Sequence, residues 1–123
     1  MEDIRAQQIE ALEVFKNYNS RLVKSMDSII PELEGDRKDD TDKFLDEIVK
    51  GINWEIGILN GTMDFINEKE ERIKKEEINA SILKLSKALE GKKDSEIAAS
   101  LKETLPVFEN FGKVAAEVLK DAK

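Results

Sequence analysis

Apolar residues recur at helical spacing in four separate stretches of the chain. Within each stretch they return every three or four residues, which places them on one side of an α-helix. The four stripes are Leu12, Phe15, Asn19 (the one polar member), Leu22, Met26, Ile29 and Leu33; Leu45, Val49, Ile52, Ile56, Leu59, Met63 and Ile66; Ile78, Ile82, Leu85 and Leu89; and Leu101, Leu105, Phe108, Gly112, Ala115 and Leu119. They predict helices near residues 3–33, 40–70, 75–90 and 95–121.

Residues typical of helix ends lie between these stripes. Gly35 and Gly91 each follow a stripe, where a left-handed residue commonly ends a helix. Asp39, Asp40 and Thr41, and later Asp94 and Ser95, are suitable N-caps for the second and fourth helices. Two prolines lie inside predicted helices, so we expect Pro31 to end the first helix early and Pro106 to kink or split the fourth near residues 102–104.

The two halves of the chain share one pattern. A shift of 56 residues overlays Leu22 on Ile78 and Leu45 on Leu101 without a gap, although any two amphipathic hairpins overlay to some extent. We therefore predict an all-α fold, an antiparallel up-down four-helix bundle made of two similar helical hairpins. It forms a single domain over residues 1–123, with hairpin 1 at about 3–70 and hairpin 2 at about 75–121.

Composition narrows the classes of function. The 123 residues include no cysteine and no histidine, so thiol nucleophiles, Cys/His metal sites and Ser-His-Asp triads are excluded. The formal net charge is −7, which argues against general nucleic-acid binding. No apolar run approaches the roughly 20 residues that span a bilayer. We expect a cytoplasmic protein without membrane insertion.

Carboxylates are the most abundant candidates for chemistry. None falls in the four stripes, so we expect them on solvated faces, without the burial that acid–base catalysis needs. The aspartates between residues 36 and 46 lack the spacing of a calcium loop, and no glycine-rich loop precedes Lys-Ser/Thr. We expect no catalytic residue, no metal and no cofactor.

A second apolar stripe lies on the second helix, opposite its predicted core side. On a helical wheel with Leu45 at zero, Trp54, Ile58 and Phe65 all lie on the far side. Small residues and amides accompany them. The candidate partner-binding residues are Trp54, Ile58, Phe65, Gly57, Gly61, Asn53 and Asn60.

This second stripe allows three interpretations. Each helix of a bundle contacts two neighbours, so a wide apolar arc is normal, and a break at Asn60-Gly61-Thr62 would return Phe65 to the core. Alternatively, the stripe marks a homodimer or a groove for a protein partner. The outward position of Trp54 and Phe65 requires one continuous helix.

Two short segments resemble known groups. The residues Ala88-Leu89-Glu90-Gly91, followed by Leu105-Pro106 and Phe108, together with Gly51-Ile52-Asn53-Trp54, are similar to small uncharacterised helical-bundle proteins of Gram-positive bacteria. In its small size and its acidic, helical character the chain also resembles flagellar export chaperones, which are small acidic bundles that hold a helical segment of a client. Neither resemblance assigns a role to a residue.

The sequence thus favours a non-enzymatic protein-interaction module, an adaptor or chaperone-like bundle that binds a partner or itself through helix faces. Two alternatives stay open. One is a structural homo-oligomer or an immunity-type protein. The other is a small-ligand binder or enzyme with a site between helices.

Overall fold

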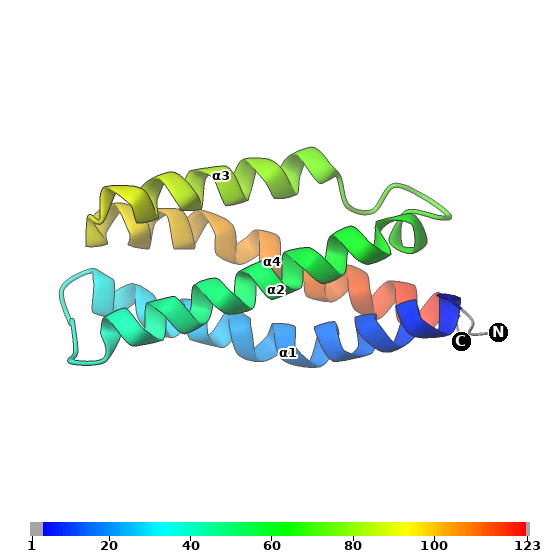
Figure 1. Ribbon diagram of the computed structural model, residues 1–123, viewed down its shortest axis with the longest axis horizontal. Coiled ribbons are helices and arrows are strands. Elements are labelled where there is room, and N and C mark those ends of the chain that lie inside the picture. The colour runs from blue at the N-terminus through cyan, green and yellow to red at the C-terminus, as the bar shows by residue number, and fades with distance from the viewer. Residues whose placement is uncertain (1–3, 123) are drawn as a thin grey trace.

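The computed structural model describes residues 4–122, which form four helices. They are α1 (Ile4–Leu33), α2 (Thr41–Ile66), α3 (Lys75–Gly91) and α4 (Asp94–Ala122). Successive helices run in opposite directions, and both ends of the described chain lie at the same end of the molecule (Figure 1). The fold is an all-α antiparallel four-helix bundle made of two hairpins, as the periodicity predicted.

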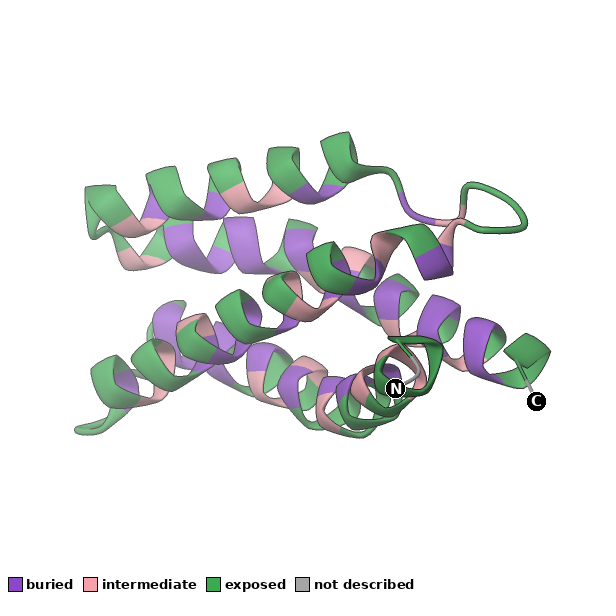
Figure 2. Cartoon of the chain, turned by 45° about the vertical axis from the view of Figure 1, so that its right-hand side comes forward, coloured by how far each residue is buried: buried purple, intermediate pink, exposed green. Residues whose placement is uncertain are grey.

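The helices do not contact one another equally. The largest interface joins α1 to α4, α2 packs on α1 and α3 packs on α4. Contact between α2 and α4 is slight, and α2 and α3 are not a closely packed pair in the described part of the chain. Buried positions therefore concentrate along the middle of the bundle, whereas much of α3 is exposed (Figure 2).

Two predicted helix ends need correction. α2 ends at Ile66, four residues before the expected end, because Asn67 holds the chain in a turn: its side-chain Oδ1 accepts hydrogen bonds from the backbone N–H of Arg72 and of Ile73. The left-handed residue after α3 is Lys92 (φ 56°) rather than Gly91, although Gly35 does have a positive φ of 145°.

Both prolines lie within their helices. α1 runs past Pro31 to Leu33 rather than ending early, and α4 is one continuous helix through Pro106 rather than two. Each proline leaves one backbone carbonyl of the preceding turn without its usual donor.

The core side of α2 is rotated from the predicted one. Its buried residues are Thr41, Ile48, Gly51, Ile52, Glu55, Leu59, Thr62, Phe65 and Ile66. Four residues of the predicted stripe, Leu45, Val49, Ile56 and Met63, are only half-buried. The most regularly spaced apolar residues of α2 lie on one flank of its buried side, so a prediction centred on them is rotated toward that flank.

None of the described helices combines the length and the apolar character needed to cross a membrane.

Candidate functional site

Trp54 lies on the outer surface of α2 where this helix meets α1. Its side chain is 41% exposed, and its ring meets the edge of Tyr18 with ring centroids 5.3 Å apart at 83°. Val14, one turn before Tyr18 on α1, is 50% exposed. These three side chains and Gly51 line a shallow groove between the two helices, edged by the charged residues Arg21, Glu47 and Lys50.

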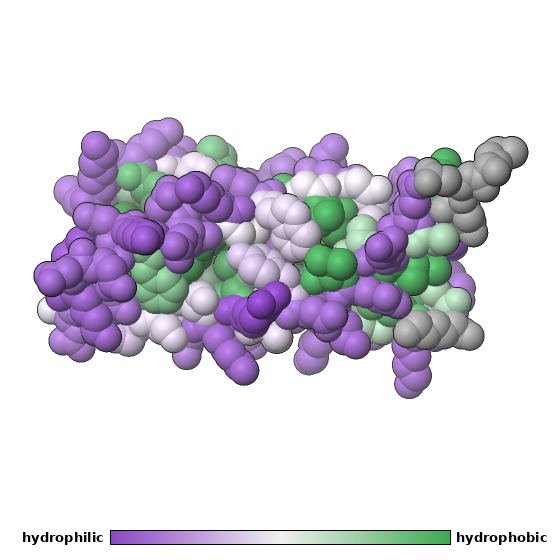
Figure 3. Space-filling view, turned by 60° about the horizontal axis from the view of Figure 1, so that its bottom comes forward, coloured by the Kyte–Doolittle hydropathy of each residue, from purple (hydrophilic) through white to green (hydrophobic). Residues whose placement is uncertain are grey.

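Two exposed glycines lie on α2 beyond Trp54. Gly57 and Gly61 are exposed, and apart from their chain neighbours and the adjoining backbone of α2, no described atom lies within 4 Å of the position that a Cβ would take at either glycine. Ile58 beside them is half-buried. We call this surface, formed by Val14, Tyr18, Trp54, Gly57, Ile58 and Gly61, the Trp54 face. Pale and apolar side chains lie along the middle of the face of α1 and α2, between charged side chains (Figure 3).

The structure brings together most of the predicted site residues but not all of them. Asn53 and Asn60 are exposed and are next in sequence to Trp54 and Gly61 on α2. α2 is continuous through Gly57 and Gly61, so a break is not what shapes this helix. Phe65 is the exception. It is only 6% exposed and packs in the core, so the prediction that it lies on the outer face is wrong.

The burial of Phe65 follows from the rotation of α2. With the core side centred near Ile48 and Glu55, Phe65 falls on the flank of α2, where its ring is buried. The guanidinium of Arg5 lies 4.2 Å from the centre of this ring, in a cation–π contact that joins α1 to α2.

The expectation that all carboxylates lie on solvated faces is also wrong. Glu55 is 0% exposed on the core side of α2, and Glu32 is buried near the end of α1. Glu32 accepts a hydrogen bond of 2.7 Å from the hydroxyl of Thr41, whose oxygen in turn accepts one from the N–H of Lys38. Glu32 therefore supports the turn between α1 and α2.

Glu55 has a poorer set of partners. Asn19 Nδ2 donates to Glu55 Oε1 at 2.9 Å, and Glu55 Oε2 has no hydrogen-bond partner within residues 4–122. Burial raises the pKa of Glu55 from 4.5 to about 7, against the smaller lowering effect of the Asn19 hydrogen bond. No second titratable side chain among the described residues contributes to this shift, so Glu55 does not belong to an acid–base pair.

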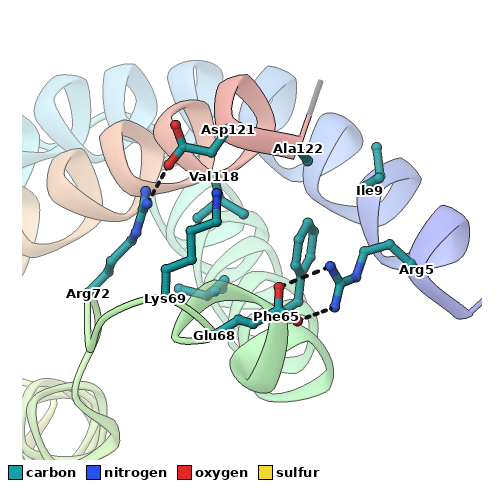
Figure 4. Close-up of a pocket in the computed structure, with 10 residues that line it drawn as sticks. Arg5, Ile9, Phe65, Glu68, Lys69, Arg72, Val118, Asp121 and Ala122 are labelled. Atoms are coloured by element: carbon teal, nitrogen blue, oxygen red, sulfur yellow. Dashed lines mark hydrogen bonds and ion pairs between the residues drawn. The ribbon is translucent and has the colours of Figure 1, made fainter.

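A small pocket lies at the end of the bundle where the two ends of the described chain meet (Figure 4). Its volume is about 140 Å³, and Phe65, Ile9 and Val118 form its apolar part. Arg5 forms two hydrogen bonds with Glu68, of 3.0 and 3.1 Å, and Arg72 pairs with Asp121 across the pocket. Two of the cations that line the pocket, Arg5 and Arg72, thus already have acidic partners.

These ion pairs hold segments that are distant in sequence. Arg5 lowers the pKa of Glu68, and Arg72 lowers the pKa of Asp121, in each case mainly through the hydrogen bond between them. The Arg5–Glu68 pair connects α1 to the residues after α2, and the Arg72–Asp121 pair connects the α2–α3 loop to α4. We interpret the pocket as part of the closure of this end of the bundle. In residues 4–122, no group of three or more acidic side chains could hold a metal ion.

Comparison with known families gives one match. Residues 10–114 match the domain of unknown function DUF8042, which covers most of the chain. The chain belongs to this family. The matched residues include nearly all of the four helices, and hence Trp54, Tyr18 and Glu55. No curated protein and no solved structure matches the chain significantly.

Sequence reasoning missed the α1 half of the site. Tyr18 was noted only as a neighbour of the polar core residue Asn19, and Val14 was not singled out. The sequence did contain a signal: Val14 and Tyr18 are four residues apart, so they lie on the same flank of α1. That spacing does not say which helix lies alongside, and only the structure pairs this flank with Trp54.

Proposed function

We propose that the chain is a non-enzymatic protein-interaction module that binds another protein through the Trp54 face. The exposed indole of Trp54 carries this proposal. A tryptophan held by a neighbouring ring with much of its surface open is well suited to anchor a protein interface, where this residue type is enriched. Its support by Tyr18 fixes the ring before binding, which lowers the entropy lost on association.

The two glycines on the Trp54 face support the same function. A glycine inside a helix destabilises it by about 1 kcal/mol relative to alanine. Packing within the chain accounts for Gly51 and Gly112, where a Cβ would meet Tyr18 and Asn19 respectively. It does not account for Gly57 or Gly61, which border open space. A partner whose backbone comes close to α2 accounts for both.

The expected mode of binding is a helix laid along the groove between α1 and α2. Such a role fits an adaptor or a chaperone-like bundle acting in the cytoplasm. A second copy of the chain is the other possible occupant, and the experiment below distinguishes it from a different protein.

The test is site-specific crosslinking in cells of the native host. A photo-crosslinking amino acid replaces Asn53, which is exposed beside Trp54, or Ser86, which is exposed on α3. We expect a discrete adduct from position 53 and none from position 86, and the mass of the adduct reports whether the occupant is another protein or a second copy. Trp54→Ala in the same chain reduces the adduct at least tenfold.

The matched control for that substitution is Leu83→Ala. Leu83 is 57% exposed on α3, so its truncation also removes an exposed apolar side chain, and we expect the adduct to persist. Equal adducts from positions 53 and 86, or an adduct at 53 unaffected by Trp54→Ala, would contradict the proposal. Circular dichroism and thermal unfolding of both alanine variants confirm that each is folded.

A further inference from the structure

Glu55 is an acidic side chain fixed in the centre of the bundle. It faces the line along which α2 meets α1 and α4, and its 0% exposure leaves it without contact with solvent. The residues one turn away on α2 are Gly51, Ile52, Ile58 and Leu59, none of which carries a charge. The carboxyl therefore has no partner on its own helix.

The hydrogen bonds around Glu55 connect three helices. Asn19 of α1 donates from Nδ2 both to Glu55 Oε1 of α2, at 2.9 Å, and to the backbone oxygen of Phe108 in α4, at 3.1 Å. Both amide hydrogens are thereby used. The Asn19 side chain also lies directly against Gly112 of α4, where a Cβ would overlap its oxygen. Asn19 thus has no further donor to offer, and Glu55 Oε2 stays without a partner.

Among the described residues, no charged group from a neighbouring helix compensates this carboxyl. On the adjoining turns, Lys16 and Arg21 of α1 and Glu109 and Lys113 of α4 are exposed, and none of them contributes to the shifted pKa of Glu55. Tyr18 is half-buried, with its hydroxyl against Gly51. An ionised Glu55 would be a buried charge with one hydrogen bond, which is strongly unfavourable unless water reaches it.

We propose that Glu55 is a proton-sensitive latch that holds α2 against α1 and α4 when the carboxyl is protonated and loosens α2 when the proton is lost. α2 is the helix that would move, because it packs closely only on α1, touches α4 slightly and is not closely packed on α3. An outward displacement of α2 lets water solvate the carboxylate, while α1, α4 and α3 keep their mutual contacts.

The direction of the effect follows from linkage. The pKa of Glu55 is 4.5 when solvated and about 7 when buried, so the closed state holds the proton more tightly than the open state. The opening of α2 therefore becomes more favourable by about tenfold for each pH unit between 4.5 and 7, and levels off above that range. The latch is closed in mildly acidic solution and loosest at neutral and basic pH.

Hydrogen exchange by mass spectrometry tests the latch at pH 5, 6, 7 and 8, after correction for the intrinsic pH dependence of amide exchange. We expect the protection of α2 amides to fall at least tenfold between pH 5 and pH 7 and then to stay constant. The protection of α3 changes much less, because α3 packs on α4 and is not closely packed on α2. In Glu55→Gln the change in α2 is absent, whereas Glu47→Gln, at an exposed position of the same helix, retains it.

Two outcomes would overturn the proposal. One is an equal loss of protection in all four helices, which would show that Glu55 affects only global unfolding. The other is a pH dependence of α2 that persists unchanged in Glu55→Gln.

A measurement on the unaltered protein covers the case in which Glu55→Gln does not fold. Carbon-13 NMR of the glutamate side-chain carboxyls follows the titration of Glu55 directly. A midpoint near 7, together with the loss of α2 protection over the same pH range, supports the latch. A midpoint near 4.5 in the folded protein overturns it. Trp54 is the only tryptophan and directly precedes Glu55 in α2, so its fluorescence follows the same transition.

Discussion

At the scale of single residues, the interior of this bundle contains one pair that sequence periodicity could not predict. Asn19 was recognised as a polar member of its stripe, but its partner Glu55 is 36 positions away and lies between Trp54 and Ile56 on α2. A glutamate is rarely buried, so a hydrophobicity pattern assigns it to the surface. Recognising the pair requires knowing which helix faces Asn19, and that is a tertiary property.

The pair predicts how stability depends on pH. Because the pKa of Glu55 is raised to about 7 in the folded state, its contribution to stability is greatest at low pH and is lost as the pH rises toward 7. We expect the free energy of unfolding to fall by about 2 to 3 kcal/mol between pH 5 and pH 7. Urea denaturation at a series of pH values measures this change.

Ion-paired carboxylates have the opposite effect on the pH dependence of stability. The pKa values of Glu68, Asp94 and Asp121 are lowered by their arginine partners, so their contribution is lost as the pH falls below about 4. The range from pH 5 to 7 therefore isolates Glu55. In Glu55→Gln we expect a flat profile there, and a wild-type stability that rises with pH over this range would contradict the assignment.

At the scale of helices, sequence reasoning gave the number, order and approximate ends of the elements but misjudged the orientation of α2. Apolar residues surround much of this helix, so more than one centre fits the same spacing. The true centre includes Glu55 and Thr62, and both lower the apparent hydrophobicity of the side that is buried. This error of orientation is also why Phe65 was assigned to the outer face while Trp54 was assigned correctly.

The glycines of α2 provide a test at this scale. Replacing both Gly57 and Gly61 by alanine introduces no clash, and helix propensity should stabilise the chain by about 1 to 2 kcal/mol in total. If a partner approaches the backbone of α2 at these positions, the same double variant loses binding, measured as loss of the crosslinked adduct formed from position 53.

Gly112→Ala is the matched contrast, because there a Cβ overlaps the Asn19 side chain. We expect that variant to be destabilised by about 1 to 3 kcal/mol. A double variant of Gly57 and Gly61 that is more stable and still binds normally would show that these glycines do not contact the partner.

At the scale of the whole molecule, the pairing of helices departs from the symmetry of the sequence repeat. If the two hairpins were equivalent in packing, α2 would pack on α3 as α1 packs on α4. Instead α1 and α4 form the central interface, and α3, with 17 residues, is much shorter than α1, with 30. The repeat concerns only the spacing of apolar residues, and it does not specify which faces meet.

This arrangement predicts a gradient of local stability. At pH 5, where Glu55 is protonated, we expect amide hydrogen exchange to be slowest in α1 and α4, intermediate in α2 and fastest in α3, because the interface of α3 with α4 is smaller than that of α2 with α1. Exchange that is equally slow in α3 and α4 would indicate that the bundle opens only as a whole.

The dominance of the α1–α4 interface has a consequence for how the chain acquires its structure during synthesis. The apolar face of α1 leaves the ribosome early, but its main partner is roughly ninety residues further along the chain. Until α4 has emerged, α1 and α2 remain an incomplete hairpin with much of its apolar surface in water. Bringing the two distant segments together also requires closing a long loop, which favours slow folding relative to bundles whose contacts are mainly local. The nascent chain therefore depends on its final quarter to fold, and truncation before α4 should yield a species that chaperones recognise.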